Sequence, residues 1–179
     1  MRLFIAIDLN EEVRGNIKAV QRKLGHEGLK LVEPENLHLT LKFLGEVPES
    51  DLHKIESSIS DSVKGLNEFK LSFHGVGYFG SERFMKVIWA GVDSGKEQFI
   101  SLARSLEERL SFVRKEEREP SPHLTIARVN STSPKLAHEI ASLKGVKLGE
   151  IRVKEISLKK SVLTPQGPIY SDVKAFPLK

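Results

Sequence analysis

Two short phrases of the sequence each place a histidine one residue away from a threonine. They read His38-Leu39-Thr40-Leu41 and His123-Leu124-Thr125-Ile126. In an extended strand, side chains two positions apart share a face, so each histidine lies beside its threonine while the aliphatic residues face a core. The chain has six histidines and four threonines, and half of the threonines stand in these phrases. Because the phrase occurs twice, we interpret it as functional rather than accidental.

The chemistry suggested by two such pairs is proton transfer around a negatively charged group. A histidine side chain titrates near neutral pH, so one imidazole can take a proton from a nucleophile while the other gives a proton to a leaving group. The threonine hydroxyls can donate hydrogen bonds to charge that develops in the transition state. This combination suits displacement at a phosphodiester and requires no metal ion.

Two alternatives compete with a catalytic role for the histidines. A single histidine on a strand is usually satisfied by local hydrogen bonds, and only the repetition argues against that reading here. A zinc site needs three or four histidine, cysteine or carboxylate ligands, and threonine is not among them. The remaining histidines have no partner at a suggestive spacing and are expected on the surface; they are His26, His53, His74 and His138.

The composition is that of a globular protein. The chain has 179 residues, of which 39% are hydrophobic and 29% are charged, and it contains no cysteine. Disulfides, thiolate nucleophiles and cysteine-bound metals are therefore excluded. No apolar run approaches membrane-spanning length and no signal peptide is recognisable, so we expect a cytoplasmic protein without membrane contact. A net charge of +4 mildly favours an anionic partner such as nucleic acid.

Hydrophobic periodicity indicates strands and helices that occur in the same order twice. A strand over residues 2–9 precedes a helix capped by Asn10, and a strand ending near Gly45 carries the first phrase. Asp8 precedes the histidine of the first phrase by the same interval as Asp93 precedes that of the second, so the offset between the copies is close to half the chain. The other predicted elements are a short strand at 29–32, helices over 52–63, 99–110 and 134–143, and strands over 69–73, 85–92, 151–158 and 169–176.

These elements predict an α+β fold in which residues 1–179 form a single bilobal domain. We interpret residues 1–85 and 86–179 as duplicated β-α-β-α-β halves related by a pseudo-twofold axis. Antiparallel-rich sheets would line a central cleft with the helices outside, and an exchange of terminal elements between the lobes is one version of this arrangement. The axis would bring the two histidine–threonine faces together across the cleft.

The paired phrases resemble the 2H phosphoesterase superfamily. Within it, the blocks at residues 2–9, 36–47 and 122–129 are similar to the RNA 2′,3′-cyclic phosphodiesterases, also called 2′-5′ RNA ligases, and the similarity spans nearly the whole chain. The resemblance implies hydrolysis of a 2′,3′-cyclic phosphate on RNA, including tRNA fragments, to a 2′-phosphomonoester without a cofactor. It also implies ATP-independent 2′-5′ joining if an RNA 5′-hydroxyl replaces water. We expect a monomer with no obligate protein partner.

The resemblance implies roles for specific residues. His38 would be the proton donor and His123 the proton acceptor, with Thr40 and Thr125 holding phosphate oxygens, although the pseudo-symmetry leaves the two histidine roles exchangeable.

Three further residues are expected to bind substrate. Arg128 lies near the position of a family arginine, but strand alternation turns it away from the cleft unless a twist or bulge intervenes. Phe43 is a candidate for stacking on a base, with a core position as the alternative. Arg118 belongs to a charge run before the second phrase and could contact backbone phosphate, although such runs usually form solvated loops. Lys42 and Lys86 are expected to be ordinary strand residues.

Two alternative functions remain at this point. A non-catalytic RNA-end binder would use the same cleft without forming product, and its affinity would depend on salt. A related 2H enzyme could act on another cyclic phosphate or on the 3′ tail of RNA.

Overall fold

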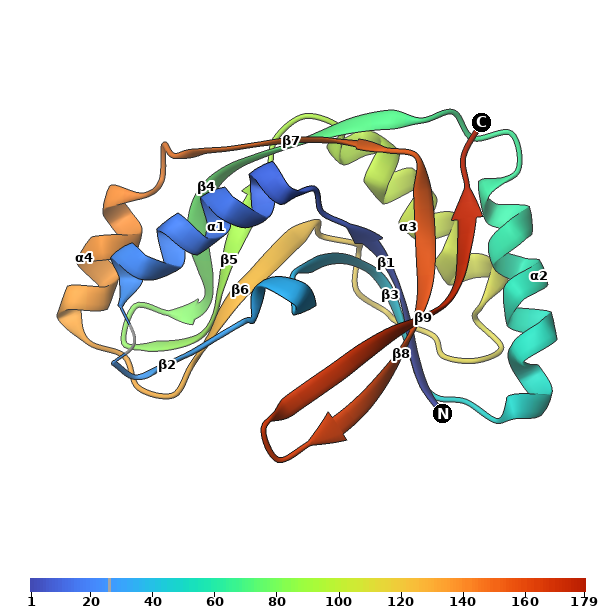
Figure 1. Ribbon diagram of the computed structural model, residues 1–179, viewed down its shortest axis with the longest axis horizontal. Coiled ribbons are helices and arrows are strands. Elements are labelled where there is room, and N and C mark those ends of the chain that lie inside the picture. Colours follow the sequence, from blue (N-terminus) through green and yellow to red (C-terminus); the bar gives the residue numbers. More distant parts are fainter. Residues whose placement is uncertain (26) are drawn as a thin grey trace.

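The computed structural model describes residues 1–25 and 27–179, which form two antiparallel sheets and four helices (Figure 1). The first sheet has the order β3-β1-β8-β9, from β3 (His38–Glu46), β1 (Arg2–Asp8), β8 (Glu155–Thr164) and β9 (Gly167–Pro177). The second has the order β2-β6-β5-β4-β7, from β2 (Leu29–Leu31), β6 (His123–Val129), β5 (Phe84–Val92), β4 (Phe69–Ser81) and β7 (Lys147–Val153). This architecture confirms the predicted α+β class.

The helices follow the predicted periodicity. They are α1 (Glu11–Leu24), α2 (Leu52–Val63), α3 (Lys96–Arg109) and α4 (Pro134–Ser142), with short 3₁₀ turns η1 (Pro34–Asn36) and η2 (Glu49–Asp51). Asn10 caps α1 as predicted, because its Oδ1 accepts a hydrogen bond from the Val13 backbone N–H at 2.9 Å. The start and the end of α3 are displaced from those of α1 by the same offset that separates the two histidine phrases. Helices α2 and α3 pack together at the end of the molecule opposite α4 (Figure 1).

Strands from the two sequence halves are mixed between the sheets. β4 from the first half lies in the second sheet, whereas β8 and β9 from the second half lie in the first sheet. The single strand predicted over residues 151–158 is therefore wrong, since β7 ends at Val153 and β8 begins at Glu155 in the other sheet. Lys154 and Glu155 are both exposed where the chain crosses, which interrupts the alternation of a regular strand. The division into residues 1–85 and 86–179 stays a proposal.

The hydrophobic core holds β1 in a fixed place between β3 and β8. Residues 3–7 of this strand are each at most 2% exposed, which confirms the expected buried first strand. Leu3, Ile5 and Ile7 belong to the main core cluster, whereas Phe4 is in contact with the rings of His38 and Tyr170. One face of β1 thus packs in the core and the other contacts the His38 ring. Any movement of β1 would therefore disturb both the core and His38.

Candidate active site

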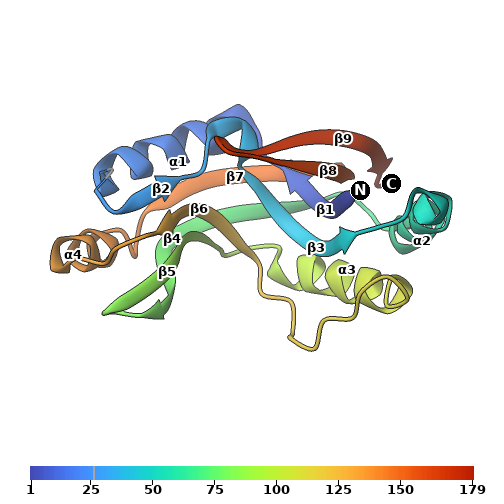
Figure 2. The ribbon, with the colours of Figure 1, turned by 90° about the horizontal axis from the view of Figure 1, so that it is seen from below.

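The two histidine strands meet where the two sheets face each other. β3 of the first sheet and β6 of the second are in contact, and they lie next to each other near the middle of the molecule (Figure 2). Between them lies a cleft of about 1520 Å³. All seven residues expected to act on substrate line it, namely His38, Thr40, Phe43, Arg118, His123, Thr125 and Arg128. The fold therefore brings the two phrases together, as the repeat predicted.

A β-bulge interrupts each histidine strand at the same point. The register of β3 against β1 shifts at Leu41, and the register of β6 against β5 shifts at Ile126. A bulge reverses the alternation of side chains beyond it. Phe43 and Arg128 therefore come to the open face together with the histidines and threonines. The bulge that Arg128 required is present, and Phe43 is 46% exposed and so is not a core residue.

Each histidine ring is oriented by a carbonyl group two residues earlier in the chain. His38 Nδ1 donates to the Asn36 carbonyl oxygen at 2.7 Å, and His123 Nδ1 donates to the Ser121 carbonyl oxygen at 2.7 Å. Because a carbonyl can only accept, the Nδ1 atom carries the proton in both rings. Nε2 is thus the atom through which each histidine can exchange a proton with a ligand.

Each histidine also meets the edge of an aromatic ring. The Tyr170 ring lies 5.3 Å from His38 at an interplanar angle of 85°, and the Phe79 ring lies 4.8 Å from His123 at 83°. Both aromatic residues line the cleft. Sequence reasoning missed them, because they stand on β9 and β4, far from either phrase. Burial raises the pKa of the Tyr170 phenol.

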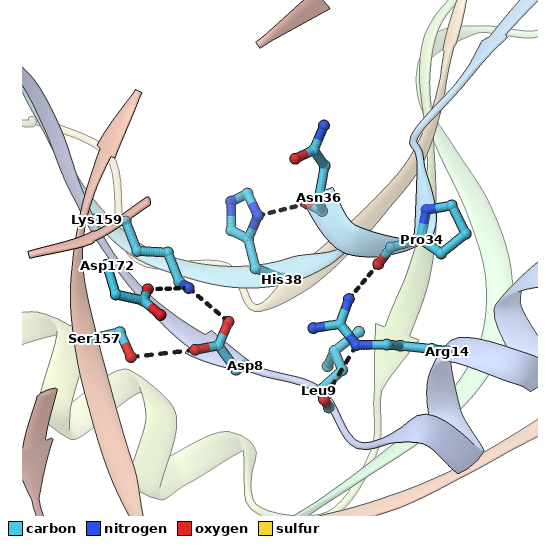
Figure 3. A network of polar contacts seen from close by, with 9 residues as sticks. All are labelled: Asp8, Leu9, Arg14, Pro34, Asn36, His38, Ser157, Lys159 and Asp172. Carbon is cyan, nitrogen blue, oxygen red and sulfur yellow. Dashed lines mark hydrogen bonds and ion pairs between the residues drawn. The ribbon is translucent and has the colours of Figure 1, made fainter. Parts of the chain in front are cut away.

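A network of charges lies beside His38 (Figure 3). Lys159 Nζ contacts Asp8 at 2.9 Å and Asp172 at 2.5 Å. Burial alone would lower the pKa of Lys159, but the hydrogen bonds that it donates to these two carboxylates raise it. Asp8 also accepts a hydrogen bond from the Ser157 hydroxyl at 3.1 Å. Lys159 is thus held in its charged form near the imidazole.

The pKa of His38 is lowered by this environment. The largest cause is burial, which disfavours the imidazolium, and the Lys159 charge acts in the same direction. The Asn36 carbonyl and the Asp8 carboxylate oppose the shift without cancelling it. In this environment His38 is therefore more readily neutral than an ordinary histidine, and an anionic ligand would favour its protonation.

Arg14 holds the turn that orients His38. From α1 it donates to the Pro34 carbonyl and, at 3.2 Å from Nε, to the Leu9 carbonyl (Figure 3). Pro34 begins η1, and Asn36 at its end provides the acceptor for the His38 ring. Arg14 is thus a support that the sequence did not reveal.

Lys42 anchors the loop that leads to His123. Its side chain is buried, forms an ion pair with Glu107 of α3, and donates to the Arg114 carbonyl at 2.9 Å. Glu107 also accepts from the Glu116 backbone N–H at 2.7 Å. Burial alone would raise the pKa of the Glu107 carboxyl, but the hydrogen bonds from Lys42 and Glu116 lower it. The prediction that Lys42 is an ordinary strand residue is wrong, because the bulge turns it inward.

Gln21 supports the bulge in β6. This buried residue of α1 donates from Nε2 to the Ile126 carbonyl at 2.9 Å and to the Val32 carbonyl at 2.8 Å. The Ile126 carbonyl also accepts from the Val32 backbone N–H at 3.0 Å. The bulge at Ile126 is what turns Arg128 to the open face of β6. Gln21 therefore contacts directly the bulge that exposes this arginine.

The other histidines take no part in the cleft where they are described. His53, His74 and His138 are exposed on α2, β4 and α4, and His26 lies outside the described residues. Within residues 1–25 and 27–179, no group of three or more histidine, cysteine or acidic residues could hold a metal ion. Across the same residues, no helix is long and apolar enough to cross a membrane.

The family model for LigT-like phosphoesterases matches the chain twice, over residues 7–89 and 91–170. Each match contains one histidine phrase. The chain belongs to the LigT-like phosphoesterase family. The RNA 2′,3′-cyclic phosphodiesterase of Methanothermobacter thermautotrophicus is 43% identical, and the match covers 99% of both proteins. The protein of the same name from Methanocaldococcus jannaschii is 41% identical, covering 97% of this chain and 99% of that protein.

Solved structures of this family share the whole architecture. A crystal structure from Thermus thermophilus has a TM-score of 0.85 at 32% identity, covering 99% of this chain and 98% of the other. The Escherichia coli LigT structure complexed with 3′-AMP has a TM-score of 0.81 at 27% identity, covering 99% and 97%. The family assignment therefore rests on sequence and on fold together.

Proposed function

We propose that this protein is an RNA 2′,3′-cyclic phosphodiesterase that opens the cyclic phosphate to a 2′-phosphomonoester. The observation that carries the proposal is the convergence of both histidine–threonine pairs on one cleft, with each Nδ1 bonded to a carbonyl. This leaves one Nε2 atom from each sheet for proton transfer. The names of the full-length relatives from several archaea support the same substrate.

The reaction would proceed by displacement at phosphorus. His123 Nε2 takes a proton from water as the water oxygen bonds to phosphorus. The bond from phosphorus to the ribose 3′ oxygen breaks, and His38, protonated once the anionic substrate is bound, donates the Nε2 proton to that oxygen. Thr40 and Thr125 donate hydrogen bonds to the non-bridging oxygens, whose charge grows in the transition state. The histidines end with their protonation states exchanged, and solvent restores them.

The remaining cleft residues would bind the nucleotide. Arg128 on the open face can donate to the phosphate, and the exposed Phe43 ring can stack on the terminal base. Arg118 at the entrance is exposed and can contact a backbone phosphate. If an RNA 5′-hydroxyl replaces water, the same site would join two ends through a 2′-5′ linkage. The monomeric state, the cytoplasmic location and tRNA fragments as substrate stay predictions.

The direct test is incubation with cytidine 2′,3′-cyclic phosphate in the presence of a chelator. We expect cytidine 2′-phosphate as the product. Absence of turnover, together with salt-dependent binding of the RNA end, would support the non-catalytic binder instead. Formation of the 3′ isomer would mean that the opposite phosphorus–oxygen bond breaks, which contradicts the proposed geometry.

The two histidine roles can be separated with a substrate whose leaving group needs no proton. On bis-(p-nitrophenyl) phosphate, we expect His38→Ala to keep far more of the wild-type rate than His123→Ala, since only the base is still required. The reverse order would exchange the two roles. Equal losses in both variants would contradict any division into acid and base.

A further inference from the structure

Basic side chains from four elements gather on one side of the cleft. They are Arg22 of α1, Lys30 of β2, Lys86 of β5 and Arg128 of β6, and all four are exposed and line the cleft. Lys30 and Arg128 stand directly opposite each other in the pairing of β2 with β6. Arg128 in turn pairs with Val87, the residue after Lys86. The cations therefore form a row across three adjacent strands, with α1 beside it.

This row is unfavourable for the protein alone. Like charges directly opposite on neighbouring strands destabilise a sheet. Within residues 1–25 and 27–179, none of the four cations forms an ion pair, whereas Lys70 on β4 pairs with Glu150 and Lys174 on β9 pairs with Glu56. The nearby acidic residues of the η1 region, Glu33 and Glu35, are exposed and make no ion pair with the row. The arrangement is thus suited to an anionic ligand.

The size of the cleft indicates that the ligand is longer than one nucleotide. Sites for single small molecules usually enclose about 300–1,000 Å³, and this cleft measures about 1520 Å³. The rim that carries Arg118 also carries Glu107, Glu116 and Glu119, whose carboxylates are paired with Lys42, Arg114 and Arg104. The row of cations, which form no ion pair within the described residues, lies on the other side. A strand that has its cyclic end between the histidines would therefore leave the cleft along the basic side.

We propose that Arg22, Lys30 and Lys86 form a binding track for the backbone phosphates of the RNA strand on the 5′ side of the cyclic end. The track continues from Arg128, which lies beside Thr125 on the open face of β6. It would bind RNA regardless of sequence, because phosphates carry no base information. The proposal rests on the proposed function, and it adds that the substrate is an oligonucleotide held over several nucleotides.

The test compares a mononucleotide with an oligonucleotide in one triple variant. For Arg22→Gln/Lys30→Gln/Lys86→Gln, we expect kcat/KM on a ten-nucleotide RNA with a 2′,3′-cyclic end to fall about 10- to 100-fold at low salt. We expect kcat/KM on cytidine 2′,3′-cyclic phosphate to stay within about twofold. Each phosphate contact contributes about 0.7 to the slope of log affinity against log salt for single strands, so the slope should fall by about 2.

A second triple variant controls for total charge. Lys64, Lys135 and Lys147 are exposed, lie outside the cleft and are in no ion pair within the described residues. Their change to glutamine also lowers the formal net charge from +4 to +1. We expect this variant to behave like the wild type on both substrates. If kcat/KM on RNA falls equally in both triple variants, the loss comes from the lower net charge and not from the track, and the proposal is overturned.

Two further results for the track variant would overturn the proposal. One is that kcat/KM and the salt slope on RNA are unchanged. The other is that kcat/KM falls equally on the mononucleotide and on RNA. Binding of the same RNA with a non-cyclic 3′-phosphate, followed by fluorescence anisotropy, gives the salt slope without turnover. If the wild type hydrolyses neither substrate, the proposed function fails, and this binding measurement still decides whether the track exists.

Discussion

Phe43 and Arg128 occupy equivalent positions in the two histidine strands, and each follows a β-bulge. Each stands at the same distance along the chain from the histidine of its own phrase, His38 or His123. The bulges present an aromatic ring on one side of the cleft and a guanidinium on the other. The cleft is therefore symmetric in the two histidines proposed as proton carriers and asymmetric in the two residues proposed to bind substrate. This asymmetry can give the terminal nucleotide a fixed direction, with its base toward β3.

Phe43→Ala is expected to raise KM for cytidine 2′,3′-cyclic phosphate about tenfold with little change in kcat. Base stacking on an aromatic ring contributes about 1–3 kcal/mol. The matched control is Phe112→Ala, since Phe112 is 43% exposed and lies under Lys54, outside the cleft. Steady-state kinetics measure both. Equal effects of the two substitutions on KM would mean that Phe43 does not bind the base.

Gln21→Met is expected to raise KM by acting through Arg128. The substitution removes the Nε2 donor from the Ile126 carbonyl and so loosens the bulge that presents the arginine. We expect about a tenfold rise in KM in the wild-type background and less than about twofold in the Arg128→Ala background. Equal rises in both backgrounds would mean that Gln21 contributes only general stability. If Arg128→Ala alone has no effect on KM, Arg128 does not contact substrate.

Lys42→Met is expected to destabilise the protein by about 2 kcal/mol, measured by urea unfolding. Removing one partner of a buried ion pair costs about 3–5 kcal/mol, and the partial exposure of Glu107 reduces this. Combination with Glu107→Gln should cost less than the sum of the two single changes. The exposed pair of Lys70 and Glu150 provides the control, since Lys70→Met should cost less than about 1 kcal/mol. Equal costs at the two lysines would contradict the anchoring role.

The stability that Glu107 contributes should depend on pH. Its carboxyl pKa is lowered in the folded state, so the unfolded chain binds the proton more readily. The contribution is complete above the ordinary value of 4.5 and is lost as pH falls through the lowered pKa. In Lys42→Met this loss should be smaller. If the unfolding free energy of Lys42→Met depends on acid pH in the same way as that of the wild type, Lys42 is not the cause of the lowered Glu107 pKa.

The pH dependence of kcat/KM should report the lowered pKa of His38. As the proposed acid, His38 must be protonated in the free enzyme while the proposed base His123 is neutral, so the two apparent pKa values of the profile belong to the pair. One of them should lie below the ordinary histidine value of 6.5. Asp8→Asn should move that apparent pKa to lower pH and Lys159→Met to higher pH, because the two charges have opposite effects. Two apparent pKa values above 6.5, or no shift in either variant, would contradict the assignment.

The repeat made much of the fold predictable. Its constant offset aligned α1 with α3 and β3 with β6, because hydrophobic periodicity is preserved in both copies. The crossing at Lys154 was missed, although the two consecutive charged residues Lys154 and Glu155 break the alternation of apolar residues there. The change of sheet itself has no local signal. Which sheet a strand joins depends on its partners rather than on its own residues.

The site was predictable only where chemistry and spacing coincide. The histidines and threonines stand in a repeated phrase, whereas Tyr170 and Gln21 reach the cleft from distant elements with no local signal. Arg128 illustrates the intermediate case, because alternation alone turns it inward and a bulge restores it. The location of a bulge depends on the partner strand. The only hint in the sequence is that two consecutive apolar residues, Ile126 and Ala127, precede Arg128.

In the proposed mechanism, two imidazoles act on one phosphorus atom. The most direct measurement is the initial rate of hydrolysis of a 2′,3′-cyclic phosphate RNA by His38→Ala, by His123→Ala and by the double variant, with chelator present and folding verified. Each general acid or base contributes about 10²–10⁴ in rate, and paired groups act as a unit. We predict that each single variant loses at least about 10²-fold and that the double variant is hardly worse than the slower single one. A single variant that keeps more than about a tenth of the wild-type rate would contradict a mechanism in which both histidines transfer protons.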